Sequence, residues 1–404
     1  MRIPALMLSA ALAMAQLSPA AAQEKTVKIG VLTDLSSLYS DITGQGSMLA
    51  AQMAVEKSGL LAKGWKIEVV SGDHQNKADI GSGIARQWYD RDGVDVIVDV
   101  PNSAVALAVS GLTREKNKVF LNSSAATSDL TNAQCSPNTV HWTFDTYMLA
   151  HGTGTGVVKN GGDSWFFLAA DYAFGASLER DTAAVVKSLG GTVVGSVKHP
   201  PNSPDFSSYL LQAQSSKAKV IGLANGGGDT INAIKQAAEF GIVQGGQRLS
   251  PLLLFITDVN SLGLKVAQGL TFTESFYWDM NDGTRTFSKE FSDRMKSHAM
   301  PTMGQAGVAS SVWHYLKALE ALGGNTKDGA AIVAKMKSMP TDDPLFGKGS
   351  IRADGRKIHP AYVFEVKKPA ESKGPWDYYK LISTIPAEDA FLPLSESKCP
   401  LVGK

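Results

Sequence analysis

The stretch TVKIGVLTDLSSLYSD (residues 26–41) sets the pattern that the rest of the chain repeats. An apolar run, Val27 to Leu32, leads into a polar loop, and an amphipathic segment (48–56) follows. Further apolar runs then alternate with amphipathic ones, at 66–70, 85–89, 94–98, 104–114 and 119–121. Strands that alternate with helices form a parallel sheet covered on both faces. We therefore predict a first α/β lobe over about residues 26–145.

A second series of the same kind follows the first. Helices are expected at 150–159, 176–189, 206–215 and 230–240, and strands at 164–169, 192–199, 220–224, 252–256 and 269–276. Three long helices without intervening strands (288–296, 306–322 and 330–339) are expected to pack back on the first lobe. We predict lobe 1 over 26–145 plus 277–358, lobe 2 over 146–276 plus 359–388, and a tail, 389–404, that returns toward lobe 1. Open α/β sheets bind ligands at the carboxyl ends of their strands, so a cleft between the lobes is the expected site.

The first 22 residues have the features of an export signal. Arg2 precedes a short, mostly apolar run, which ends in the small residues 18–22. This pattern predicts cleavage after Ala22. A membrane anchor is the alternative, but the run is too short to cross ~30 Å of hydrocarbon and is broken at Pro19.

Composition excludes a strong electrostatic attraction to nucleic acid or anionic lipid. The chain has 39 basic and 38 acidic side chains, and loss of Arg2 with the signal leaves a formal charge of zero. Its two cysteines, Cys135 and Cys399, are expected to form one disulfide in an oxidising compartment. Two free thiols are the alternative, and metal ligation is disfavoured because neither has a partner at C-x-x-C spacing.

No motif in the sequence indicates catalysis, a cofactor or a metal. The glycine-rich segments 152–156 and 226–228 lack the spacing of phosphate-binding loops. The seven histidines form no H-E-x-x-H, and no G-x-S-x-G is present. The sequence therefore predicts a protein that is not an enzyme.

Three loops rich in hydroxyl and amide groups follow the strands of the first lobe, at 34–41, 99–104 and 122–131. The second and third each open a helix or turn, so hydroxyls and backbone N–H groups would converge on an anion such as a carboxylate. Simple capping of the helix is the alternative.

Second-lobe candidates are mostly aromatic. Tyr172 and Phe174 follow one strand, and Tyr277 belongs to an aromatic cluster near a crossover. Asp258 is predicted at a strand end, where its carboxylate could accept from a ligand ammonium or hydroxyl, or cap the next helix.

The export signal, VKIGVLTDLS (27–36), SSAATSDLT (123–131) and DYAFG (171–175) together resemble the leucine/isoleucine/valine-binding receptors of ABC transporters. The resemblance covers essentially the whole mature chain. It implies the type I periplasmic-binding fold, with two α/β lobes whose parallel central sheets are joined by a three-stranded hinge. By motif, Asn102, Ser103, the Ala125 backbone and Thr127 fall where the family holds a ligand carboxylate, and Asp258 where amino-acid binders place an acid for the ligand ammonium. The loops and the resemblance give this candidate ligand-binding set: Tyr39, Asn102, Ser103, Ser124, Ala125, Thr127, Tyr172, Phe174, Asn225, Asp258 and Tyr277.

Departures from that pattern bear on the ligand. Residues 223–229 lack the bulky aromatics that some amino-acid binders carry, which leaves room for a larger ligand. Segments 73–77, 100–108 and 374–379 are similar to a branch that includes receptors for plant-derived aromatic acids. The resemblance thus implies a monomeric periplasmic receptor that delivers a carboxylate-bearing ligand, first a hydroxycinnamate or related aromatic acid, to the membrane permease of an ABC importer. An aliphatic amino acid is the alternative ligand, and presentation to a sensor kinase is the alternative role.

Overall fold

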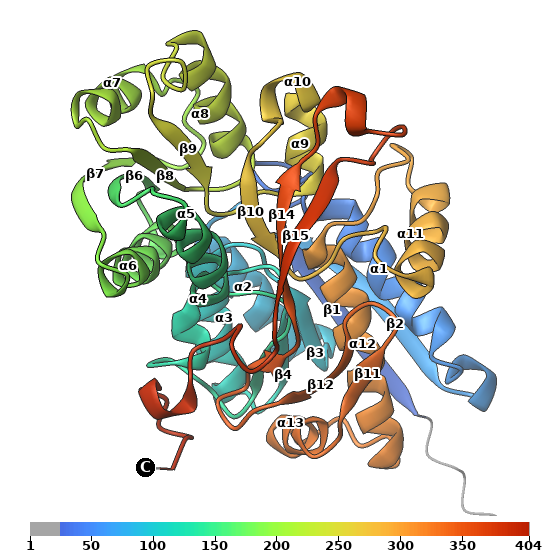
Figure 1. Cartoon of the computed structure of the whole chain (residues 1–404). Coiled ribbons are helices and arrows are strands. Elements are labelled where there is room, and N and C mark those ends of the chain that lie inside the picture. The colour runs from blue at the N-terminus through green and yellow to red at the C-terminus, as the bar shows by residue number, and fades with distance from the viewer. Residues whose placement is uncertain (1–24, 404) are drawn as a thin grey trace, which may run out of the picture.

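The structure, a computed structural model, describes residues 25–403 and is built around two parallel β-sheets (Figure 1). The predicted signal peptide and its cleavage site lie outside the described residues. Within residues 25–403, no helix combines the length and the apolar character that a bilayer crossing requires. The α/β class and the two-lobed arrangement predicted from the sequence are confirmed.

The first lobe contains a five-stranded sheet in the order β2-β1-β3-β4-β5, with every pair parallel. Its strands are β1 (Thr26–Thr33), β2 (Lys66–Asp73), β3 (Val96–Asp99), β4 (Val119–Asn122) and β5 (Thr139–His141). The helices of this lobe are α1 (Gly44–Lys57), α2 (Ala78–Gln87), α3 (Ser103–Glu115), α11 (Asp282–Arg294), α12 (Met303–Ala321) and α13 (Gly329–Lys337). Apolar residues of α1, α12 and α13 pack on one face of the sheet, and those of α2 and α3 pack on the other. Because both faces are covered, the central strands β3 and β4 are continuous buried runs.

The second lobe repeats this construction with a four-stranded parallel sheet, β7-β6-β8-β9. Its strands are β6 (Ser164–Ala170), β7 (Thr192–His199), β8 (Val220–Ala224) and β9 (Arg248–Pro251). Its helices are α4 (Thr146–Leu149), α5 (Thr155–Lys159), α6 (Ala173–Ser188), α7 (Ser207–Ser215), α8 (Gly228–Glu239), α9 (Ile256–Leu262) and α10 (Leu264–Ala267). An antiparallel sheet of β10 (Thr271–Glu274), β14 (Ala361–Val366) and β15 (Tyr379–Ile385) lies beside it.

Short elements complete the fold. A small antiparallel sheet consists of β11 (Thr341–Asp343), β12 (Gly347–Ile351) and β13 (Lys357–Ile358). Single turns of 3₁₀ or π-helix are η1 (Leu61–Lys63), η2 (Trp88–Asp92), η3 (Ser128–Thr131), η4 (Ala150–Gly154), η5 (Pro369–Glu371) and η6 (Leu394–Glu396).

Three segments connect the lobes before the C-terminal tail crosses back after β15: one after β5, one after β10 and one between β13 and β14. Arg356, next to the third connection, is fully buried, and its guanidinium donates to the carbonyls of Trp142 (3.1 Å) and Thr143 (2.7 Å) in the first. It also lies 3.7 Å from a carboxylate oxygen of Asp145. The buried guanidinium of Arg356 therefore links the first and third connections of the hinge to each other.

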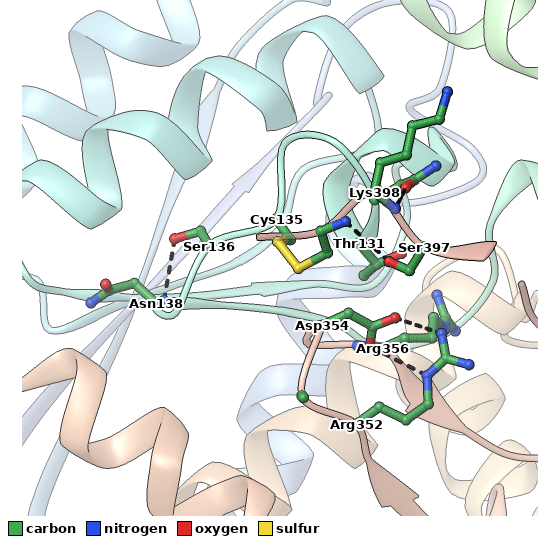
Figure 2. Close-up of a disulfide and its surroundings, with 12 residues drawn as sticks. Thr131, Cys135, Ser136, Asn138, Arg352, Asp354, Arg356, Ser397 and Lys398 are labelled. Atoms are coloured by element: carbon green, nitrogen blue, oxygen red, sulfur yellow. Dashed lines mark hydrogen bonds and ion pairs between the residues drawn. A yellow bond between two sulfur atoms is a disulfide. The ribbon is translucent and has the colours of Figure 1, made fainter. Parts of the chain in front are cut away.

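A disulfide fastens the C-terminal tail to the first lobe, as the sequence predicted (Figure 2). Cys135 follows η3, and its partner Cys399 lies beyond β15 and η6. The backbone N–H of Lys398 donates to the Asn132 side chain at 2.5 Å, and Phe391 of the tail is 1% exposed. After its last strand in the second lobe, the chain therefore returns to the first lobe and is locked there.

One predicted strand is wrong in a way that matters for the site. The run LLLFI (252–256) was expected to be a strand, but β9 ends at Pro251 and Ile256 begins α9. Residues 252–255 are buried non-strand chain, with Phe255 at the N-cap of that helix. Asp258 thus lies in the first turn of a helix and not at a strand end.

Candidate functional site

A carboxylate shapes the first loop of the cleft, which follows β1. Asp34 is fully buried, and its carboxylate accepts hydrogen bonds from the backbone N–H groups of Ser37 (2.9 Å) and Tyr39 (2.8 Å). The Asn76 side chain also donates to it, at 2.5 Å. An acid that accepts several local N–H bonds forces the chain into a tight turn. The turn fixes the backbone from which the Tyr39 ring extends toward the second lobe.

The second loop begins with an unusual backbone. Asp99, the last residue of β3, and Val100, which follows it, have positive φ angles of 78° and 60°. A β-branched residue rarely adopts this region, and such conformations cost about 1–3 kcal/mol each and cluster at binding sites. Burial raises the pKa of Asp99 to about 6, although a hydrogen bond donated by Ser124 opposes the shift. The kink directs Pro101 into the cleft.

The polar groups predicted to hold a carboxylate lie together, but they bond mainly to one another. Asn102 caps α3, because its side-chain oxygen accepts from the N–H groups at 104 and 105. Ser103 Oγ accepts from the Thr127 N–H at 3.2 Å, and Thr127 Oγ1 lies 2.8 Å from Ser177 Oγ of the second lobe. The Ala125 N–H donates to the Asn122 side chain at 3.1 Å. In this closed arrangement, the Thr127 hydroxyl contacts the opposite lobe.

Aromatic and apolar side chains face one another between the lobes. The hydroxyls of Tyr39 and Tyr172 lie 2.5 Å apart, and burial raises the pKa of both phenols, so each stays neutral. The cavity is lined by Tyr39, Ile42, Pro101, Ser124, Ala126, Tyr172, Phe174, Leu253 and Phe255. Its volume is about 20 Å³, close to what a single water needs. The lobes must therefore part to admit any organic ligand.

Polar contacts between η3 and α6 hold the lobes together beside this cavity. Ser128 Oγ donates to the Asp181 carboxylate at 2.8 Å, and Arg180 donates to Ser128 Oγ at 2.8 Å. Arg180 is also 3.3 Å from an oxygen of Asp129. Because these charges are partly exposed, each contact is worth little, and the set can break when the cleft opens.

Seven of the eleven predicted residues do not line the cavity. Four of them are the polar groups described above, Asn102, Ser103, Ala125 and Thr127, and the other three are bonded elsewhere. Asn225 is fully buried, donates toward His199 Nε2 (3.1 Å) and accepts from Thr230 (2.7 Å). Tyr277 donates to the Trp376 carbonyl at 3.1 Å and stacks on Tyr379. The third is Asp258, whose carboxylate turns back to accept from the Phe255 N–H at 2.9 Å. The Asp258 carboxylate therefore caps the N-terminus of α9, which is the alternative role that the sequence offered for it.

Five apolar residues that line the cavity were missing from the predicted set: Ile42, Pro101, Ala126, Leu253 and Phe255. Two of them, Pro101 and Ala126, lie in the loops 99–104 and 122–131, from which other residues were predicted to bind the ligand. Apolar residues that directly follow a strand end are the signal that could have identified them. Phe255 also packs edge-on against Phe144, at 6.0 Å between ring centroids.

Burial raises the pKa of Asp258 to about 7, with the Phe255 N–H opposing the shift. The folded protein therefore holds this proton more tightly than the unfolded chain, whose aspartates titrate near pH 4. The contribution of Asp258 to stability is greatest below about pH 4 and falls as the pH rises toward 7. We expect Asp258→Asn, which stays neutral and still accepts from Phe255, to be more stable than the parent by up to about 4 kcal/mol at pH 8 and nearly equal at pH 4. Denaturant unfolding at both pH values tests this.

The exposed Asp171→Asn variant is the control for Asp258→Asn and should change stability little at either pH. Equal stabilisation by Asp258→Asn at pH 4 and pH 8 would show that burial of its charge is not the cause.

No group of three His, Cys, Asp or Glu residues within 25–403 is arranged to hold a metal ion. Residues 26–374 match the family described as periplasmic binding protein. The chain belongs to this family. A periplasmic binding protein from Burkholderia mallei is 52% identical, with a TM-score of 0.90 over 93% of this chain and 99% of that one.

Two further solved structures share the same architecture. A branched-chain amino-acid ABC transporter periplasmic ligand-binding protein from Burkholderia xenovorans LB400 is 40% identical, with a TM-score of 0.82 over 93% of this chain and 100% of that one. A solute-binding protein of an ABC transporter from Rhodopseudomonas palustris BisB5, solved with 3,4-dihydroxybenzoic acid, is 23% identical, with a TM-score of 0.80 over 93% and 99% of the two chains. The resemblance seen in the sequence and the type I periplasmic-binding fold are thereby confirmed.

Proposed function

We propose that this periplasmic binding protein closes around a small carboxylate-bearing aromatic acid and delivers it, unchanged, to an ABC importer. The observation that carries the ligand class is the cavity lining: of the described residues that form it, none is acidic or basic. An α-amino acid would bury its ammonium there without a charged partner, at a cost of several kcal/mol.

Aromatic surfaces on both lobes favour a flat ligand. Tyr39 on the first lobe faces Tyr172 and Phe174 on the second, and Phe255 completes the wall. Stacking adds about 0.5–1.5 kcal/mol beyond the burial of apolar area. The tyrosine hydroxyls offer partners to a ligand phenol once they part from each other.

The carboxylate is proposed to bind beside Ser124 and Ala126, where Ser103 and Thr127 already share a hydrogen bond. In the closed structure the Thr127 hydroxyl contacts Ser177, so opening the lobes releases it for a ligand. Hydrogen bonds to a charged group contribute about 1.5–3 kcal/mol. Neutral donors can therefore hold the anion without a buried cation.

The test is calorimetric titration of the purified mature protein with 4-hydroxycinnamate and, separately, with leucine. We expect 4-hydroxycinnamate to bind and Phe174→Ala to weaken it at least tenfold, because burial and stacking together are worth about 2–3 kcal/mol. Phe240→Ala, which removes a ring that is 40% exposed and outside the cavity, is the matched control and should bind normally.

Asp258→Asn separates the two ligand classes. It should change 4-hydroxycinnamate affinity less than tenfold, because its carboxylate points to the Phe255 N–H and not into the cavity. Tight leucine binding that collapses in Asp258→Asn would contradict the aromatic assignment. Mass spectrometry of the recovered ligand should show no conversion, and a new product would contradict the transport role.

A further inference from the structure

The second lobe contains a groove separate from the interlobe cleft and much larger, about 1170 Å³. It lies between β9 and the sheet of β10, β14 and β15, and α5 and the π-turn η4 form its other wall. Figure 1 shows α5, β9, β10, β14 and β15 grouped on this side of the lobe. Ligand sites in proteins commonly enclose about 300–1,000 Å³, so the groove can take an entire small amphiphile.

Aliphatic side chains form most of its walls. They come from the helices and from both sheets: Val157, Ile234, Val243, Leu249, Val266, Leu270, Val363, Ile382 and Ile385. Three of them are large apolar groups open to solvent, with Val243 51%, Val266 40% and Ile382 49% exposed. Exposed apolar residues gathered around one hollow, in contrast to scattered ones, indicate a binding surface.

The charges around the groove are unbalanced. Lys159, Arg248 and Lys265 line it, against the single carboxylate of Glu365. Arg248 donates to the Asn160 carbonyl at 3.0 Å, which fixes it at the edge. Burial lowers the pKa of the remaining titratable group, His151, so its ring is neutral near pH 7. The excess of positive charge suits a ligand with one anionic group.

A buried hydroxyl provides an independent indication of a ligand. Ser250 of β9 is 2% exposed and lines the groove, and its Oγ has no hydrogen-bond partner among residues 25–403. Buried polar atoms are almost always paired, and each exception calls for an explanation. Within residues 25–403, β9 is hydrogen-bonded to β8 alone, so its other edge also faces this space.

We propose that this groove binds an amphipathic monoanion, a carboxylate with an aliphatic chain of about ten or more carbons. The chain would lie along the aliphatic walls and the carboxylate would meet Lys159 and Lys265, with Ser250 donating to the ligand. All three strands β10, β14 and β15 contribute lining residues, and β10 and β14 each adjoin a connection between the lobes. The site is distinct from the cleft, since its lining shares no residue with the cleft cavity.

The probe is dodecanoate, titrated calorimetrically into the mature protein below its micellar concentration, with dodecanol as the neutral counterpart. Gly156→Phe is the blocking variant, because Gly156 lines the groove and a Cβ built on it meets nothing within 4 Å. We expect Gly156→Phe to weaken dodecanoate at least tenfold, and the double variant Lys159→Gln/Lys265→Gln to weaken it at least fivefold. The exposed Lys235→Gln, on α8 but outside the groove lining, is the charge control and should stay within twofold.

Phe174→Ala distinguishes binding in the groove from binding in the cleft. Phe174 lines the cleft cavity and not the groove, so this variant should leave dodecanoate binding unchanged. No saturable binding, loss of binding in Phe174→Ala, or equal affinity for dodecanol would each overturn the proposal. Circular dichroism of Gly156→Phe verifies that the variant folds, and the lysine double variant tests the site without filling it.

Discussion

Replacing both Cys135 and Cys399 by alanine is expected to lower the free energy of unfolding by up to about 5 kcal/mol. The bond joins residues 264 apart, and closing so long a loop removes much of the conformational freedom of the unfolded chain. The bond also holds the tail on the first lobe, where Phe391 is buried against Arg356 at 4.1 Å. Equilibrium unfolding in denaturant measures the difference.

Reduction of the parent protein should reproduce the loss, and the double alanine variant should not respond to reductant. The tail beyond β15 should also become the first site of proteolysis, because without the bond it is held only by the burial of Ala390 and Phe391 and by a few hydrogen bonds, such as that of Lys398 to Asn132. Unfolding midpoints that coincide with and without the bond would contradict this expectation.

Arg356→Met should cost about 3–5 kcal/mol, the range for removing one member of a buried charged pair. The guanidinium donates to the carbonyls of Trp142 and Thr143 and lies near Asp145, so methionine removes both hydrogen bonds. It also leaves the buried carboxylate of Asp145 without its cationic partner. Burial raises the pKa of Asp145 and the charge of Arg356 opposes that shift. The lost interactions all join connections between the lobes, so the variant should also change the balance between open and closed forms.

A double-mutant cycle separates the pair from the rest of the hinge. Arg356→Met/Asp145→Asn should cost less than the sum of the two single changes, because the second removes the unpaired charge. Arg86→Met, an exposed arginine on α2, is the control and should change stability by less than about 0.5 kcal/mol. Strict additivity in the cycle would show that the two groups do not interact.

The alternation of apolar and amphipathic runs was enough to predict the two sheets, because the central strands β3, β4, β6 and β8 are short apolar runs that are almost entirely buried. It failed at 252–256, where five apolar residues are a buried segment that leads into α9 and not a strand. Hydrophobic periodicity cannot distinguish a buried strand from a buried segment without regular structure, since both are continuously apolar. The error placed Asp258 at a strand end, whereas a carboxylate in the first turn of a helix bonds to the N-cap N–H.

The site was predictable in outline but not in detail. Tyr39, Tyr172 and Phe174 were placed in the cleft from their loops, and the structure brings their rings to one cavity. The Ala125 N–H, by contrast, is taken by Asn122, and the Tyr277 hydroxyl by a carbonyl distant in sequence. The spacing of residues in the sequence does not reveal such hydrogen bonds. A residue with suitable chemistry can therefore be predicted near a cleft while its polar group is bonded elsewhere.

The return of the tail also affects where reporter groups can be attached. Thr26 begins the first strand of the first lobe, and the disulfide holds Cys399 on that same lobe. Fluorophores fused at the two ends would therefore travel together, and their separation would hardly respond when the lobes move. A pair that senses the motion needs one dye on the second lobe, for example at the exposed Leu189, and the other at a surface position such as Arg86.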